Sequence, residues 1–260
     1  MTVLVGILCQ NGVVIGADSS NTFSAGNFRT IEQNFPDKIR LVGNHLIHAG
    51  TGQVGLMQRF HALLEANCAD GQEQRRNGDG IPIGKAIARM TVDDFRETGV
   101  APGQFGALVA YAGKNKSFGL IEFGPDMQPE IKTSNLWFSS MGSGQPLVDP
   151  FLALLRRSLF SESQPRLNEG IFAVVWALQH AIELNTGGIN GPMHVGVVAY
   201  DKSKTFIEAR MTSDEELSEH QQSVEAMTKH IGSYRDQLNG RSVAVTSPPP
   251  PPSPPSNNGN

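Results

Sequence analysis

The stretch that decides the fold is TVLVGILCQNGVVIGADSS, residues 2–20, in which two apolar runs flank a short polar segment. Residues 2–8 and 13–17 are rich in β-branched and aliphatic side chains, which favour strands. The polar segment ends in Asn11 and Gly12, and Asn-Gly is a strong signal for a tight hairpin because both residues tolerate positive φ angles. The sequence therefore predicts a β-hairpin that starts at the second residue.

The composition limits the class of protein. Of 260 residues, 39% are hydrophobic, which is enough for a sizeable core, and no apolar run is long enough to span a membrane. The net charge of −4 and the lack of a long basic run argue against a nucleic-acid partner. No basic residue precedes the first apolar run, which argues against a secretory leader, and Cys9 and Cys68 are too few for a disulfide framework. We therefore expect a cytoplasmic location.

The C-terminal segment differs in composition from the rest of the chain. It reads SVAVTSPPPPPSPPSNNGN over residues 242–260 and has little apolar surface to bury. We predict one domain over residues 1–240 and a disordered Pro/Ser-rich tail over residues 241–260. The proline run is also typical of ligands for proline-recognising modules, so a solvated tail and such a ligand both fit.

The remaining apolar patterns alternate between strands and helices. Strands are predicted at residues 39–42, 45–49, 105–112, 117–123, 136–141, 195–200 and 205–209. Helical spacing of apolar residues starts near Leu56, Ile83, Leu147, Ile171 and Val224. Hairpins alternating with pairs of helices fit two antiparallel sheets that pack together under helices on both outer faces. We predict an α+β fold, a four-layer αββα sandwich.

Thr2 is a candidate nucleophile. A threonine hydroxyl is weak until a base takes its proton. If Met1 is removed, which is usual before a small residue, Thr2 carries a free α-amine with an ordinary pKa of about 7.7–8.0. One residue then serves as nucleophile and base, although a strand-forming role also explains a threonine at this position.

Two charged residues and two glycines stand at the ends of predicted strands. Asp18 ends the second strand and Lys38 begins the third. A lysine near the amine lowers the pKa of amine and hydroxyl through its charge, and Asp18 would hold that lysine protonated and oriented. Gly50 and Gly52 lie between a strand and a helix, where backbone N–H groups can face an oxyanion or a peptide. Taken singly, these residues are also typical of ordinary strand ends and turns.

Together these motifs resemble the proteasome β-subunits and their bacterial relative, the HslV peptidase. The matching pieces, in the order of the family, are TVLVGILCQNGVVIGADS, the DKI around Lys38, HAGTG around Gly50, MGSG around Ser143, and ELNTGG at residues 183–188. The resemblance covers residues 2–210 and, among these relatives, is greatest for the betaproteobacterial proteasome homologue. It implies an N-terminal-nucleophile (Ntn) hydrolase and a homo-oligomeric double ring with internal active sites.

The resemblance also implies catalytic roles. Thr2 is similar to the nucleophile of the family, Asp18 and Lys38 to its charged pair, and Gly50 to its oxyanion N–H donor. Ser143 resembles the serine that helps to move a proton near the amine. These roles follow from the resemblance, position by position.

The same resemblance implies substrate-binding residues, and the sequence departs from the family pattern at two places. Thr22 and Gly52 fall where the family binds an extended peptide, and His48 falls at the base of the pocket for the side chain that precedes the cleaved bond. A strand histidine satisfied by a local hydrogen bond fits this position equally well. If His48 does form the pocket, we expect it to gain charge as the pH falls toward 6. Glu183 and Thr186 replace the aspartate and serine that usually stand beside the amine. The segment between Asp18 and Lys38 is also longer than usual, and we expect it to project into an interior cavity.

The sequence thus predicts a self-compartmentalising threonine peptidase that cleaves peptides or unfolded proteins. No cofactor or catalytic metal is expected, because the seven histidines show no metal-ligand spacing. Two alternatives stay open: a non-catalytic ring or scaffold subunit, and an Ntn amidohydrolase that acts on small amides. Ring size, natural substrate and the existence of an unfoldase partner do not follow from the sequence.

Overall fold

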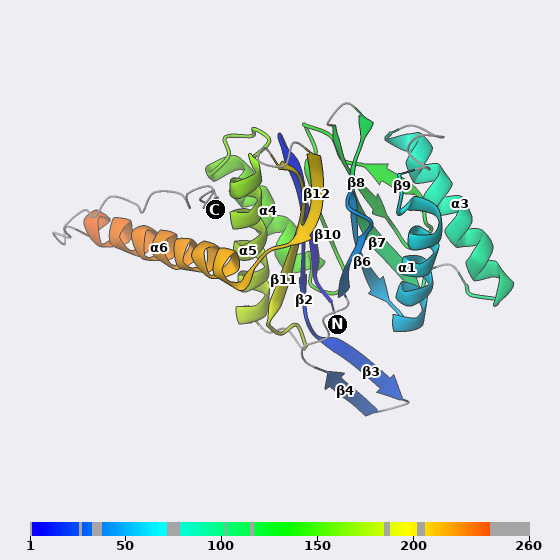
Figure 1. Cartoon of the computed structure of the whole chain (residues 1–260). Helices are drawn as coiled ribbons and strands as arrows, with labels where there is room; N and C mark the ends of the chain where they lie inside the picture. Colours follow the sequence, from blue (N-terminus) through cyan, green and yellow to red (C-terminus); the bar gives the residue numbers. More distant parts are fainter. Residues whose placement is uncertain are drawn as a thin grey trace.

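The elements lie in four layers in the computed structural model (Figure 1). The structure describes residues 2–25, 28–32, 38–71, 79–101, 103–114, 117–184, 188–201 and 206–239. Helices α4 (Gln145–Ser158) and α5 (Leu167–Leu184) cover one outer face of the paired sheets, and α1 (Val54–Cys68) and α3 (Ile81–Glu97) cover the other. The predicted αββα sandwich is confirmed.

The first sheet contains the predicted hairpin. Its strand order is β10 (Phe138–Met141), β1 (Leu4–Cys9), β2 (Gly12–Asp18), β11 (Met193–Asp201) and β12 (Phe206–Met211), with every neighbouring pair antiparallel. β1 and β2 pair from Leu4 with Ala17 to Cys9 with Gly12. All residues of both strands are buried, because the second sheet covers one face and α5 the other. The hairpin is therefore the centre of the fold.

The second sheet leaves part of one strand uncovered. Its order is β5 (Ile39–Val42), β6 (Leu46–Gly52), β7 (Phe105–Ala112), β8 (Phe118–Phe123) and β9 (Pro129–Ile131). The pairing of β5 with β6 extends only from Ile39 with Ala49 to Val42 with Leu46, whereas β7 pairs with β6 as far as Gly52. Among the described residues, the last three residues of β6 thus have a strand neighbour on one side only.

Two apolar clusters hold the layers together. One fills the space between the sheets and under α4 and α5, and includes Trp137, which is 1% exposed. The other lies between the second sheet and α1 and α3, around Phe60 and Phe123. Cys9 is buried in the first cluster, and burial raises the pKa of its thiol, so it packs as a small apolar residue.

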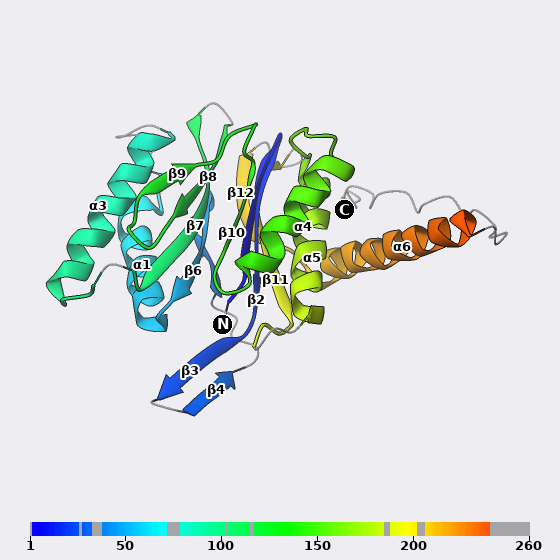
Figure 2. The same ribbon diagram turned by 180° about the vertical axis from the view of Figure 1, so that it is seen from behind.

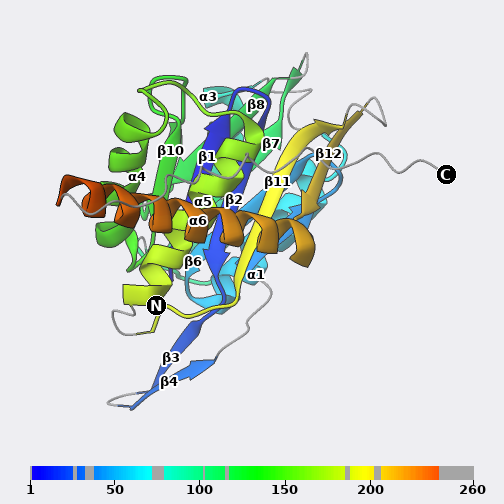
Figure 3. The ribbon, with the colours of Figure 1, turned by 90° about the vertical axis from the view of Figure 1, so that its left-hand side faces the viewer.

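Two segments extend beyond the sandwich, as Figures 1, 2 and 3 show from three sides. The hairpin of β3 (Asn21–Ala25) and β4 (Phe28–Glu32) projects from the end of β2, in the stretch expected to project as an insertion. Helix α6 (Asp214–Leu238) starts at the Ser213 cap, crosses α5 and runs outward. No helix in the described part of the chain has both the length and the apolar character needed to cross a membrane. The predicted tail lies outside the described residues.

Candidate active site

The site starts at the open end of the first hairpin. Because Leu4 pairs with Ala17, the residues just beyond this pair, Val3 and Asp18, also lie opposite one another. The Asp18 N–H donates to the Val3 carbonyl at 3.3 Å, and the Val3 N–H donates to the Asp18 Oδ1 at 2.9 Å. Hairpin register thus places the Asp18 carboxylate beside the residue that follows Thr2.

Lys38 completes a buried ion pair with Asp18. Its Nζ lies 2.7 Å from the Asp18 Oδ1, and the side chains are 1% and 0% exposed. The Ser20 N–H donates to the Asp18 Oδ2 at 3.2 Å, so both carboxylate oxygens are hydrogen-bonded. Burial lowers the pKa of Lys38, and the charge and hydrogen bond of Asp18 oppose that shift. A buried pair is costly to form and costly to break from one side, so the two residues depend on each other.

The MGSG turn encloses Thr2 from the other side. The Thr2 N–H donates to the Ser143 Oγ at 3.1 Å, the Ser143 hydroxyl donates to the Thr2 carbonyl at 3.4 Å, and the Gly144 N–H donates to the same carbonyl at 3.1 Å. Gly142 has a φ of +90°, and a Cβ there would lie 2.3 Å from the Thr2 carbonyl oxygen. The turn therefore requires glycine at 142 and fixes the Thr2 backbone nitrogen against a hydroxyl.

Gly50 is brought to the site by strand register. Ile39 pairs with Ala49 in the β5–β6 ladder, so Lys38 and Gly50 occupy the next opposed positions. Gly50 itself is tightly packed, because a Cβ there would lie 3.0 Å from the side chains of both Met57 and Phe105. The structure thus gathers Thr2, Asp18, Lys38, Gly50 and Ser143 at one end of the sandwich.

Of Glu183, Thr186 and Thr22, only Glu183 has a described side chain, and its hydrogen-bond partner is not a member of this group. Glu183 is exposed in the last turn of α5, and its Oε1 accepts a hydrogen bond from the Gln179 side chain at 2.8 Å. Thr186 lies outside the described residues. Thr22 is paired with Ile31 in the β3–β4 hairpin, and only its backbone placement is described.

His48 is a residue of β6, and its side chain packs against α1. It is fully buried, its Nε2 is 3.0 Å from the His61 Nδ1, and its ring meets the Phe60 ring edge-on. Burial, together with the smaller effects of the nearby His61 and Arg40, lowers the pKa of His48 to about 3. The expectation that His48 gains charge near pH 6 is therefore wrong, because a fully buried imidazole stays neutral there. Its place at the base of a substrate pocket stays a prediction.

The structure adds residues that the sequence did not single out. Ser19 and Ser20, which follow Asp18, are fully buried, and neither hydroxyl has a hydrogen-bond partner among the described residues. His194 pairs with Ala17, next to Asp18, and burial lowers its pKa; the charge of Asp214 opposes that shift and the charge of Lys38 adds to it. The double serine after Asp18 was visible in the sequence, whereas the position of His194 depends on the β2–β11 register.

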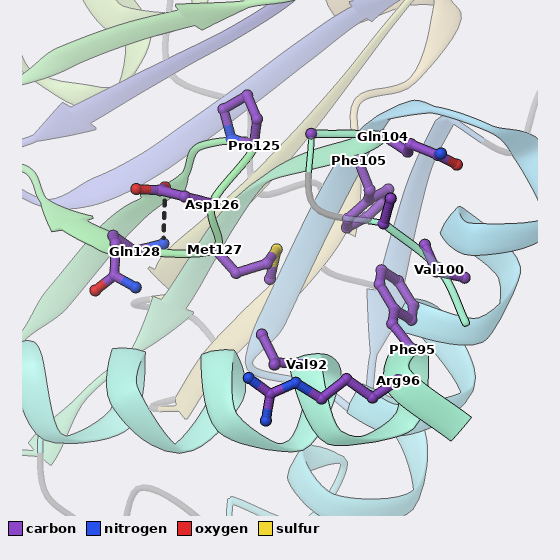
Figure 4. A pocket seen from close by; sticks show the side chains of 12 residues that line it. Val92, Phe95, Arg96, Val100, Gln104, Phe105, Pro125, Asp126, Met127 and Gln128 are labelled. Carbon is purple, nitrogen blue, oxygen red and sulfur yellow. Dashed lines mark hydrogen bonds between the residues drawn. The ribbon is translucent and has the colours of Figure 1, made fainter. Parts of the chain in front are cut away.

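A cavity near the site contains none of these residues (Figure 4). It measures about 260 Å³ and lies between α3 and the loops that precede β7 and follow β8, lined mainly by Phe95, Phe105 and Met127. It adjoins the end of β6, because Phe105 pairs with Gly52. Within the described ranges, no group of three or more His, Cys, Asp or Glu side chains is arranged to hold a metal ion.

The stacked antiparallel sheets between two helical layers, with a threonine held at the mouth of the central hairpin, are consistent with the Ntn-hydrolase sandwich. A family model described as proteasome subunit matches residues 2–198, which is more than half of the chain. The chain therefore belongs to the proteasome subunit family, whose members self-assemble into rings and act on peptide substrates. A comparison with curated proteins finds no match.

Proposed function

We propose that this proteasome-family subunit is an active threonine peptidase that uses Thr2 as its nucleophile. The observation that carries the proposal is that the buried Lys38–Asp18 pair binds the backbone of Val3, the residue after Thr2, while Ser143 binds the Thr2 nitrogen. A scaffold subunit has no need for a buried lysine whose carboxylate partner also holds the residue after Thr2. The mechanism requires that Thr2 carry a free α-amine, and therefore that whatever precedes it be removed.

The proposed reaction has two stages. The Thr2 hydroxyl oxygen attacks the peptide carbonyl carbon while the α-amine accepts its proton, directly or through water. The Gly50 N–H stabilises the oxyanion, the C–N bond breaks, and the departing amine takes the proton. Water activated by the same α-amine then hydrolyses the ester, which releases the acid product and restores the hydroxyl.

Each neighbour of Thr2 has a proposed role in these stages. The Lys38 charge lowers the pKa of the α-amine and hydroxyl, and Asp18 orients that charge. Ser143 holds the Thr2 nitrogen and passes protons to or from it. Glu183 and Thr186 are proposed to act near the amine, as the family resemblance implies, which requires that the segment after α5 approach Thr2.

Substrate binding is proposed at the uncovered edge of β6. Thr51 and Gly52 pair with β7 but lie beyond the end of β5, so an extended peptide can add alongside them as a further strand. Thr22 is proposed to contact the other side of that peptide, and His48, uncharged, to form the base of one side-chain pocket. An edge that accepts an extended backbone favours peptides over small amides.

The assembly is proposed to be a homo-oligomeric double ring with internal sites, similar to the betaproteobacterial proteasome homologue. In such a ring the β3–β4 hairpin is proposed to project into the interior cavity and to limit substrate access. We also propose a cytoplasmic location, which suits a chain with only two cysteines, both buried. We propose further that one domain spans residues 1–240 and that a disordered tail follows it.

Turnover of unstructured peptides by the purified assembly tests this function. We expect Thr2→Ala to abolish cleavage and Thr2→Ser, which keeps a hydroxyl beside the α-amine, to retain part of it. If Thr2→Ala assembles to the same mass as the wild type, the loss of cleavage is due to the missing hydroxyl and not to a failure of assembly. Peptide cleavage that survives Thr2→Ala would contradict the proposal, a wild type without peptidase activity would favour the scaffold alternative, and turnover of small amides alone would favour the amidohydrolase.

A further inference from the structure

The outer half of α6 carries an apolar stripe. Val224, Met227, Ile231, Tyr234 and Leu238 follow one another at spacings of three, four, three and four residues, which places them on one face of the helix. We call these five residues the α6 stripe. Its exposure increases along the helix, from 2% at Val224 to 56%, 58% and 70% at Ile231, Tyr234 and Leu238.

The stripe is the continuation of a packed surface. Val224 belongs to the central apolar cluster, where the first half of α6 lies against α5. Beyond it the helix leaves the sandwich and runs outward past α4 and α5, as both side views show (Figures 1 and 2). The face that packs on the body therefore continues as an uncovered apolar face.

The charges of the outer half avoid this face. Glu225, Lys229 and Asp236 project about 140–180° away from the centre of the stripe, since each residue turns the helix by about 100°. Arg235, nearer the stripe, is paired with Asp236 at 3.0 Å. The charges of Glu225, Lys229, Arg235 and Asp236 sum to zero, so the outer half indicates no partner of opposite charge.

The outer half of α6 has an exposed apolar face. Residues 225–238 continue a helix that is already nucleated at Ser213, but most helical stability in proteins comes from packing of such a face. Gly232, within this stretch, costs about 1 kcal/mol relative to alanine, and no atom packs against the position where its Cβ would be. A partner surface that covers the stripe would supply the missing stabilisation.

We propose that the α6 stripe pairs with the same stripe of a second copy of this chain. Members of the proteasome subunit family self-assemble, and the homo-oligomeric ring proposed above would bring copies of this chain into contact. Among the described residues, the other large exposed apolar side chains are dispersed: Ile81, Leu136, Leu154, Leu159 and Leu184. The stripe is therefore its own best complement, and a two-fold contact joins identical surfaces. This inference rests on family membership, the proposed ring and geometry, and not on the proposed catalysis.

The chain's own C-terminal segment is the less suitable occupant. Apart from prolines, the apolar residues after position 239 are Val243, Ala244 and Val245. Three small side chains close to the end of α6 cannot cover a stripe that extends back for about four turns. A tail occupant is nevertheless a distinct outcome of the test below.

The assembled full-length protein gives the test, by light scattering coupled to size-exclusion chromatography at low micromolar concentration. The double variant Ile231→Asp/Leu238→Asp should lower the average mass at least twofold. The matched control, Gln222→Asp/Ser233→Asp, introduces the same charges on the opposite face of α6 and should leave the mass unchanged. Equal masses for wild type and the stripe variant would overturn the proposal, as would equal losses for the stripe variant and the control.

Truncation after Asn239 and a crosslink separate the possible occupants. The truncated chain should keep the wild-type mass, and a loss as large as that of the stripe variant would identify the tail as the occupant. In Tyr234→Cys a short bismaleimide should join two chains, because residue 234 lies on the stripe. In Gln222→Cys it should not, because residue 222 lies on the opposite face of α6. The native Cys9 and Cys68 are buried and should not react. Absence of this difference would overturn the contact even if the charge variant failed to fold. Thr2→Ala should assemble as the wild type does, so a failure of the catalytic proposal would leave this result unchanged.

Discussion

Lys38 and Lys132 are both buried, but they differ in the carboxylates that surround them. The Nζ of Lys132 lies 2.7 Å from Glu122 and 2.6 Å from Glu130, so two carboxylates surround one ammonium group. Glu122 also accepts a hydrogen bond from Ser139 of the other sheet at 2.6 Å. This cluster ties β8, β9 and β10 together across the sandwich, which is a structural function.

Lys38 has a single carboxylate partner among the described residues, and that partner has other hydrogen bonds. Asp18 accepts from Val3 and Ser20 as well as from Lys38, so its charge is shared between the lysine and the backbone beside Thr2. The Asp18 carboxylate thus joins Lys38 to the backbone of Val3, the residue that follows the candidate nucleophile. Lys38 and Lys132 thus differ in the number of their carboxylate partners, one against two, and in the other groups those carboxylates bind.

The largest expected difference between variants of the two lysines is in peptidase activity. Lys38→Met should lower kcat/KM for a peptide by roughly two to four orders of magnitude, because the charge that acts on the Thr2 amine is lost. Lys132→Met should keep near-normal activity per folded chain and lower the free energy of unfolding by about 1–3 kcal/mol. Steady-state kinetics and urea unfolding measure both quantities, and equal activities in the two variants would remove the distinction.

A second variant separates charge from stability at Lys38. Lys38→Met alone leaves Asp18 buried without its partner, which is expected to cost about 3–5 kcal/mol. The double change Lys38→Met/Asp18→Asn removes that unpaired charge, so stability should be largely recovered while activity stays low. Recovery of activity together with stability would show that the lysine serves the fold alone.

Asp18→Asn is expected to have a smaller effect. The amide oxygen of asparagine can still accept from the Val3 N–H, and the lysine keeps its charge but loses its orienting partner. Peptidase activity should fall by about ten- to a hundredfold. Glu122→Gln, the matched change beside Lys132, should leave kcat/KM within about twofold of wild type. A large loss of activity in Glu122→Gln with none in Asp18→Asn would show that Lys132, and not Lys38, has the functional role.

The glycine turn tests whether the placement of Thr2 matters as much as the charge beside it. Gly142→Ala puts a Cβ against the Thr2 carbonyl at a positive φ, so we expect about 1–3 kcal/mol of destabilisation and reduced turnover. Gly55→Ala is the control, because it lies in α1 with no atom within 4 Å of the added Cβ, and alanine should stabilise the helix slightly. Thermal unfolding and turnover of both variants distinguish the two positions, and identical behaviour would contradict the close contact at Gly142.

The smallest expected effect concerns His48. Its folded-state pKa of about 3 lies below its ordinary value of 6.5, so the unfolded chain binds the proton more tightly. The His48 contribution to stability is therefore complete above about pH 6.5 and decreases as the pH falls toward 3. His48→Gln should flatten the dependence of the unfolding free energy on pH between 4 and 6.5. The relative cleavage of two peptides should not change between pH 6 and 8 in either protein, and a change that His48→Gln abolishes would show a charged imidazole.

Much of this molecule could be predicted from local sequence. Alternating and continuous apolar runs predicted β5 and β7 with their observed bounds, and predicted β1 and β2 to within two residues, because burial determines those patterns. β9 was missed, since three residues beginning with Pro129 are too short to form a pattern. The β3–β4 pair was not predicted either, although Gly26-Asn27 between two short runs is a hairpin signal in the sequence.

The site was less predictable, since it depends on register and burial. Position in the sequence suggested that Asp18 and Lys38 lie at strand ends, but only the ladders place Lys38 opposite Gly50 and Asp18 opposite Val3. Burial reversed the expected charge state of His48, which no local pattern reveals. The proximity of His194 to Lys38 likewise follows from the pairing of β11 with β2, strands that are far apart in the chain.

The central claim is that the Thr2 hydroxyl and its free α-amine perform the reaction. The most direct measurement reacts the full-length assembly with a peptide α,β-epoxyketone, a reagent that joins both an amine and a neighbouring hydroxyl, and then maps the adduct by mass spectrometry. We predict a chain that begins at Thr2 and carries the whole reagent on that residue, with no adduct in Thr2→Ala. An adduct on any other residue, or full labelling of a chain in which a residue still precedes Thr2, would contradict the claim.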